Sequence, residues 1–110
     1  MNEILEEALL YDFYGELLTD HQKAIYEQFV LEDYSLSEIA MQEGISRQGV
    51  HDLVRRCQKI LAGYEEKLHL VEKFLAIKNN VHQIEAALDG YQGGNADEIR
   101  SMTQKILEEL

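Results

Sequence analysis

Apolar residues recur with helical spacing from the first residues of the chain. Between residues 3 and 18 they fall into two adjacent rows, which predicts a helix that several neighbours bury. The first row contains Leu5, Leu9, Phe13 and Leu17, and the second contains Leu10, Tyr14 and Leu18. Thr19 and Gln22 then have the spacing of a capping box, so a second helix is expected to begin there and to end near Glu32 or Asp33. Its inward stripe is Ile25, Tyr26, Phe29 and Val30.

Residues 35–62 have the pattern of two helices joined by a short turn. Ser35 and Glu38 are spaced as a capping box, and Gly44 suits the positive φ that often follows a helix end. Ser46 is the next N-cap candidate, so the turn is about three residues long. The apolar residues expected inside the angle between the helices are Ile39, Ala40, Ile45, Val50 and Leu53. The pattern predicts a helix-turn-helix whose second helix runs to about residue 62.

A long amphipathic segment, residues 64–88, predicts one further helix, and the pattern leaves open whether Gly63 interrupts the chain before it. Its apolar positions alternate in steps of three and four, as in coiled coils, and form two seams. The seams are Leu61, Tyr64, Leu68, Val71 and Leu75, then Leu70, Phe74, Ile77, Val81, Ile84 and Leu88. One seam can cover the helix-turn-helix, and the other needs the last helix or the same helix of another copy. This predicts a homodimer through helix 64–88.

A loop at residues 89–95 separates this segment from a final short helix. Asn95 and Glu98 have capping-box spacing at its start, and its apolar row is Ile99, Met102, Ile106 and Leu110. The whole pattern predicts an all-α protein: a helix-turn-helix, a long helix and a final short helix. We expect a single domain, residues 1–110, with a helix-turn-helix core at 17–62 and a helical extension at 63–110 that serves dimerisation.

The amino-acid composition is typical of an all-helical protein and of one that lies inside the cell. The chain has 110 residues, 45% of them hydrophobic, and no proline. A single cysteine fits a reducing compartment, and no stretch approaches the roughly 18 apolar residues of a membrane span. The N-terminus is acidic where a signal peptide would be basic. We therefore expect a cytoplasmic protein.

Charge is distributed unevenly along a strongly acidic chain, whose formal net charge is −11. Residues 1–34 hold nine acids and one base, and residues 63–110 hold nine acids and five bases. Residues 35–62 hold three acids and four bases, so only the helix-turn-helix carries a positive net charge. One excess charge falls short of the basic footprint expected of a strong nucleic-acid binder.

The outward positions of the second helix are the candidate nucleic-acid contacts. Arg47 and Gln48 lie in its first turn, followed by His51 and Arg55. Recognition helices present such positions to base edges, while Arg56 and Lys59 are placed to meet phosphates. The alternative is that these residues only solubilise an exposed helix.

Three other groups of residues carry alternative chemistry. Glu65, His69 and Glu72 are spaced to hold a divalent cation or to form a solvated charged face, and His82 with Glu85 is a weaker case. Cys57 is either an apolar filler or, beside basic residues, a redox sensor. No phosphate loop, cysteine–histidine metal set or catalytic triad is visible, so we expect no enzyme activity and no cofactor.

Two resemblances are carried by identifiable segments. Residues 17–61 resemble region four of bacterial sigma factors, which reads the upstream promoter element. Nearly the whole chain resembles the YlxM-like family of small bacterial helix-turn-helix proteins. The segments that carry this second likeness are YDFYGELL at 11–18, EDYSLSEI at 32–39, SRQGV at 46–50 and YEEKLHLVEKF at 64–74.

The resemblance implies a role, because genes of the YlxM-like family lie beside the gene for the signal recognition particle GTPase. Two hypotheses follow. The first is a regulatory protein of this export pathway that meets a component of the particle through its acidic helices. The second is a transcriptional regulator whose helix 46–62 reads DNA or RNA. In the first hypothesis the helix-turn-helix serves as scaffold, and in the second it provides the candidate contacts: Arg47, Gln48, His51, Arg55, Arg56 and Lys59.

Overall fold

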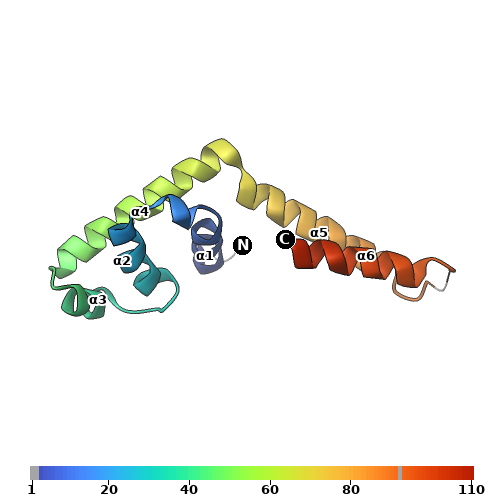
Figure 1. Ribbon diagram of the computed structural model, residues 1–110, viewed down its shortest axis with the longest axis horizontal. Coiled ribbons are helices and arrows are strands. Elements are labelled where there is room, and N and C mark those ends of the chain that lie inside the picture. Colours follow the sequence, from blue (N-terminus) through green and yellow to red (C-terminus); the bar gives the residue numbers. More distant parts are fainter. Residues whose placement is uncertain (1–2, 92) are drawn as a thin grey trace. The chain divides into compact units, whose positions relative to one another are not determined.

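The computed structural model describes residues 3–91 and 93–110, and within them the chain is helical and contains no strand (Figure 1). The predicted all-α fold class is confirmed. The elements are α1 (Glu3–Tyr14), the 3-10 turn η1 (Gly15–Leu17), α2 (Asp20–Val30), α3 (Leu36–Glu43), α4 (Arg47–Leu68), α5 (Leu70–Ala87) and α6 (Ala96–Glu109). They form two compact units, residues 1–71 and residues 72–110. None of the helices in the described ranges is long and apolar enough to cross a membrane.

The first unit is built around α4, which contacts α1, α2 and α3 (Figure 1). Its fully buried side chains come from all four helices: Tyr14, Ile25, Tyr26, Ile39, Val50, Cys57 and Leu61. Tyrosine rings pack against one another in this core, with centroids 5.8 Å apart for Tyr11 and Tyr26 and 6.0 Å apart for Tyr14 and Tyr64. Burial of large aromatic side chains provides much of the hydrophobic stabilisation of a small unit.

Most of the predicted helix ends are confirmed. The Thr19 hydroxyl accepts from the Gln22 N–H at 3.2 Å, and the Gln22 side chain accepts from the Thr19 N–H at 3.0 Å. The corresponding Ser35 and Glu38 contacts are both 3.1 Å. Gly44 ends α3 with φ of 69°, and α2 ends at Val30, slightly earlier than expected. Local sequence therefore positions the helices that form the helix-turn-helix.

The first helix is shorter than predicted, and only one of its two apolar rows is buried, although both were expected to be. The α-helix ends at Tyr14 and continues as a 3-10 turn, and the Tyr11 ring lies so close to Gly15 that a Cβ there would meet it at 2.7 Å. Tyr14 and Leu18 are buried, as the second row requires. The first row is largely exposed: Leu5 at 58%, Phe13 at 37% and Leu17 at 57%. Both rows are apolar, so the pattern alone did not show which one faces the core.

The interior of the helix-turn-helix also differs in part from the prediction. Ile39 and Val50 are fully buried, but Ile45 is 36% exposed, and Ala40 and Leu53 are half-buried. The buried stripe of α4 continues instead through Val54, Cys57 and Leu61. α4 thus faces α1 and α2 as well as α3, which turns its inward side away from Leu53.

The predicted helix 64–88 is wrong as a single element. α4 runs through Gly63 and ends at Leu68, and His69 adopts the left-handed conformation with φ of 56°. α5 then begins at Leu70. The break is held by contacts from distant residues: the Tyr14 hydroxyl accepts from the Leu70 N–H at 3.1 Å. These contacts satisfy donors that the start of a helix leaves unpaired.

The second unit is a hairpin of two helices running in opposite directions (Figure 1). Its buried residues are Val81, Leu88, Ala96 and Thr103. The predicted capping box at its second helix is absent, since Asn95 makes no side-chain capping bond. Arg100 ties the hairpin together instead, donating to the Leu88 carbonyl at 2.7 Å and to Asp97 at 3.1 Å. The predicted apolar row of α6 is wrong as an inward stripe, because Met102, Ile106 and Leu110 are exposed.

Candidate nucleic-acid interface

The candidate contacts all lie on α4, which begins with a well-formed N-cap. The Ser46 hydroxyl accepts from the Gly49 N–H at 2.9 Å, as predicted. A Cβ at residue 49 would lie 3.1 Å from that oxygen, so glycine allows the close approach. Val50, Val54 and Cys57 anchor the inner side of the helix in the core. A rigid helix therefore presents the outer side chains.

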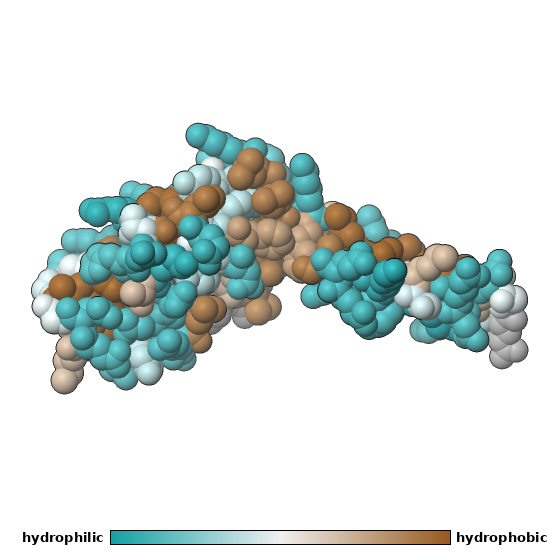
Figure 2. All heavy atoms as spheres, in the orientation of Figure 1, coloured by the Kyte–Doolittle hydropathy of each residue, from teal (hydrophilic) through white to brown (hydrophobic). Residues whose placement is uncertain are grey.

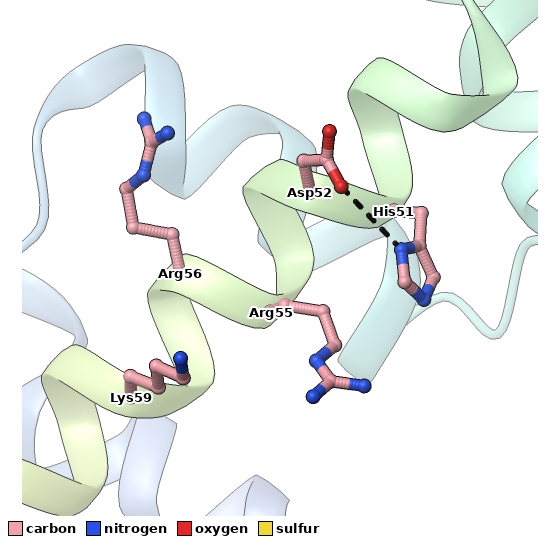
Figure 3. Close-up of a pocket in the computed structure, with 5 residues that line it drawn as sticks. All are labelled: His51, Asp52, Arg55, Arg56 and Lys59. Atoms are coloured by element: carbon pink, nitrogen blue, oxygen red, sulfur yellow. Dashed lines mark ion pairs between the residues drawn. The ribbon is translucent and has the colours of Figure 1, made fainter.

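The structure brings four of the six predicted contact residues to one shallow depression of about 410 Å³. Its lining residues are His51, Asp52, Arg55, Arg56 and Lys59 (Figure 3). Arg47 and Gln48 are exposed in the first turn of α4 but do not line it. We call the predicted contacts together, Arg47, Gln48, His51, Arg55, Arg56 and Lys59, the basic face.

Asp52 is a lining residue that the sequence analysis missed. Its Oδ1 accepts from the Gln48 amide at 2.9 Å and lies 3.6 Å from His51 Nδ1 (Figure 3). The carboxylate therefore accepts from the Gln48 amide, one of the predicted base-edge contacts, and places a negative charge among the cations. The spacing of Gln48 and Asp52, four residues apart on one helix, was the available signal.

The basic face is suited to a modest electrostatic contact. It carries four Lys and Arg side chains. If each neutralises one phosphate, a plot of the logarithm of the binding constant against the logarithm of the salt concentration has a slope no steeper than about −4. Asp52 repels phosphate and lowers the gain further. His51 Nδ1 is buried without a hydrogen bond and adds charge only when the ring is protonated.

Cys57 is an apolar filler, and the redox-sensor alternative is not supported. The side chain is fully buried. Burial raises the pKa of the Cys57 thiol, and Arg56 opposes this only in part. Reactive cysteines need solvent access and a lowered thiol pKa, and Cys57 has neither.

Glu65, the first residue of the metal alternative, has a structural role. Its Oε1 accepts from the Tyr14 hydroxyl at 2.6 Å and from the Val71 N–H at 3.0 Å, beside the break at His69. The carboxylate thereby stabilises the first turn of α5. His82 Nδ1 lies 3.2 Å from Glu85 in a local pair. In the described ranges, no three His, Cys, Asp or Glu side chains are grouped to hold a metal ion.

Comparison with known proteins places the chain among small helix-turn-helix proteins. Residues 1–106 match the model of the UPF0122 family, whose description is "Putative helix-turn-helix protein, YlxM / p13 like". A UPF0122 protein of Desulforamulus reducens is 41% identical over 110 residues, which cover 100% of this chain and 94% of that protein. One from Acetivibrio thermocellus is 50% identical over 84 residues, covering 76% and 72%. One from Clostridium kluyveri is 35% identical over 111 residues, covering both chains fully.

Proposed function

Because this chain belongs to the UPF0122 family of helix-turn-helix proteins, we propose that it is a non-enzymatic, cytoplasmic regulator that binds a component of the signal recognition particle. The proposal joins the family likeness to two surfaces of the first unit. One is the basic face of α4, and the other is the acidic side formed by α1 and α2. A ribonucleoprotein offers both the RNA and the basic protein that these surfaces would match.

The acidic side supports a protein partner. Exposed acids flank the exposed apolar row of α1, among them Glu6, Asp12 and Glu16. Leu5 and Leu17 in that row keep more than half of their surface. Apolar side chains bounded by acids match an amphipathic segment with basic flanks, and opposite charges speed the encounter.

The single observation that carries the proposal is the position of Asp52. A reader of duplex DNA gains affinity from cations that meet phosphates, and an amide that already donates within its own helix must give up that hydrogen bond to contact a base edge. Here the Gln48 amide donates to Asp52, and the chain is strongly acidic. The basic face is therefore better matched to a secondary contact on a complex than to naked duplex DNA.

The test measures binding of the full chain to four targets at low salt: the particle protein, its RNA, the assembled particle and a duplex DNA. We expect the tightest binding to the assembled particle. Arg55→Gln with Arg56→Gln should weaken that binding at least tenfold. A matched variant, Lys67→Gln with Lys105→Gln, removes two exposed charges elsewhere and should change it less than twofold. No binding to any particle component would overturn the proposal.

The acidic side has its own variant, Glu6→Gln with Asp12→Asn. Both carboxylates are exposed, so their loss should leave folding intact and slow association with the particle protein severalfold. Glu65 is unsuitable for this purpose because it accepts two hydrogen bonds at the start of α5. An unchanged association rate in the double variant would exclude the acidic side as the partner surface.

A DNA-binding transcriptional regulator is the second candidate, favoured by the exposure of Arg47 and Gln48 in the first turn of α4. Asp52→Asn tests it, since the substitution removes the repelling charge. For a DNA reader, Asp52→Asn should tighten duplex binding several-fold, and Arg47→Ala with Arg55→Ala should abolish it. Duplex binding tighter than particle binding in the unmodified chain would select this candidate over the first.

A further inference from the structure

The second unit carries an apolar face that its own hairpin does not cover. On α5, Ile77 and Ile84 are 44% and 43% exposed. On α6, Met102 and Ile106 are 54% and 40% exposed, and Ile99 beside them is half-buried. We call these five residues the isoleucine face. Figure 2 shows hydrophobic residues along one edge of this hairpin and hydrophilic residues over the visible side of α6.

Helical geometry places the five residues on one side of the hairpin. With about 100° between successive residues, Ile77 and Ile84 are both rotated in the same direction from the buried Val81. On α6, the buried residue is Thr103, and the same direction of rotation about the helix axis leads from it to Ile99, Met102 and Ile106. Since α5 and α6 run in opposite directions, the two sets point to the same side. The opposite rotation leads to the half-buried Phe74 and Leu107 and otherwise to polar residues: Lys78, His82, Glu85, Arg100 and Gln104.

The hairpin is too small to be stable with this face exposed. Residues 72–110 amount to 39 residues, and chains below about 40 residues usually need a disulfide, a metal or a partner surface. The only cysteine, Cys57, lies in the other unit. Four buried side chains, two of them Ala96 and Thr103, make a core of small volume. Covering the isoleucine face would add large apolar side chains to it.

The face has the properties of a self-complementary surface. It contains no charged residue, so no partner of opposite charge is selected by it. Ile77 and Ile84 are seven apart, and Ile99, Met102 and Ile106 are three and four apart, which is the spacing of four-helix bundles. Two identical hairpins related by a two-fold axis would supply four helices and close the assembly.

The available area indicates a weak association. Two helices of about 10 Å diameter, over the roughly 21 Å length of a 14-residue α6, present about 400 Å² per copy. The total of about 800 Å² lies below the roughly 1,200 Å² of a stable specific interface, in the range of weak and transient contacts. We propose that residues 72–110 pair with the same hairpin of a second copy through the isoleucine face, forming a four-helix bundle with a dissociation constant in the micromolar range.

Sedimentation equilibrium of the full chain between 1 and about 200 μM tests this directly, with a reversible monomer–dimer equilibrium expected. Ile106→Asp should raise the dissociation constant at least tenfold, because it places a charge in the pairing surface. The matched control is Met41→Glu, which replaces an exposed apolar residue of the first unit and should leave the constant unchanged within twofold. A monomer throughout the range, open-ended assembly, or loss of the dimer in Met41→Glu alone would overturn the proposal.

Hydrogen exchange of the unmodified chain provides a measurement that does not depend on how the variant folds. Raising the concentration from 1 to about 200 μM should slow amide exchange in α5 and α6 and leave it unchanged in residues 47–61 of α4. Exchange in α5 and α6 that is slow and independent of concentration would mean that another part of the same chain covers the isoleucine face. That result would equally overturn pairing between copies. Both experiments use only this chain. Their outcome is therefore independent of whether the chain binds the signal recognition particle.

Discussion

The two units of this protein differ in what holds them together. The first buries large side chains from four helices, including Tyr14, Tyr26 and Ile39. The second buries Val81, Leu88, Ala96 and Thr103 and leaves large apolar residues outside. Hydrophobic stabilisation grows with the apolar area removed from water, so the first unit can stabilise itself and the second needs a partner surface.

The largest expected effect comes from a core truncation in the first unit. Leu61 is fully buried, so Leu61→Ala should lower the free energy of unfolding by about 3 kcal/mol. Urea unfolding followed by tyrosine fluorescence measures it, because five of the six tyrosines lie in residues 1–71. Leu88→Ala, the matched truncation in the second unit, should leave this transition unchanged. Equal losses in both variants would show that the two units unfold together.

Alkaline pH should destabilise the first unit through its buried tyrosines. Burial is the main cause that raises the pKa of Tyr26, and burial with the hydrogen bond to Glu27 raises the pKa of Tyr11, both from an ordinary value of 10.0. A raised folded-state pKa gives stability that is complete below pH 10 and is lost as the pH rises further. We expect a loss on the order of 1 kcal/mol per tyrosine for each pH unit above 10.

The measurement is urea unfolding followed by circular dichroism at pH 8 and pH 11. Tyr26→Phe removes one of the titrating groups, so the difference between the two pH values should shrink in that variant. The second unit contains only Tyr91, which is 52% exposed and provides no buried phenol. An equal pH response in Tyr26→Phe and in the unmodified chain would contradict the assignment.

The break at His69 should depend on the hydroxyl of Tyr14. Tyr14→Phe removes the donor to Glu65 and the acceptor for the Leu70 N–H, which should cost about 1 to 2 kcal/mol. Amides 70 and 71 should also exchange faster with solvent. Tyr64→Phe is the matched control, because it removes the same atom from the neighbouring ring. Faster exchange in the control but not in Tyr14→Phe would refute the role of this hydroxyl.

The sequence predicted those features of the fold that depend on neighbouring residues. The capping boxes at Thr19 and Ser35, the left-handed Gly44 and the N-cap Ser46 are all set by residues within one turn. The break at His69 is not, because it depends on Tyr14, more than fifty residues away. A histidine that adopts positive φ leaves no local signal comparable to glycine.

For the candidate site as well, the sequence predicted some features and missed others. The outward position of the basic face followed from helical spacing and the buried stripe of α4. The net charge of residues 35–62 includes Asp52 but does not show where the carboxylate lies. On the surface of α4 the Asp52 carboxylate accepts from the Gln48 amide. Which apolar row at residues 5–18 is buried could not be predicted either, since both rows are apolar and the choice depends on packing against α2 and α4.

The smallest expected effect concerns Gly63, the residue at which the sequence left a break open. It lies inside α4, and apart from its two chain neighbours and the backbone of its own helix no atom comes within 4 Å of the position that a Cβ would take. Gly63→Ala should therefore raise the free energy of unfolding by about 1 kcal/mol, through higher helix propensity and a less flexible unfolded chain.

Gly44→Ala is the opposite control, since its φ of 69° is strained for any residue with a Cβ, and it should lose about 1 kcal/mol. Both are measured by the same urea unfolding as Leu61→Ala. If Gly63→Ala were destabilising, the chain would need glycine's freedom at residue 63.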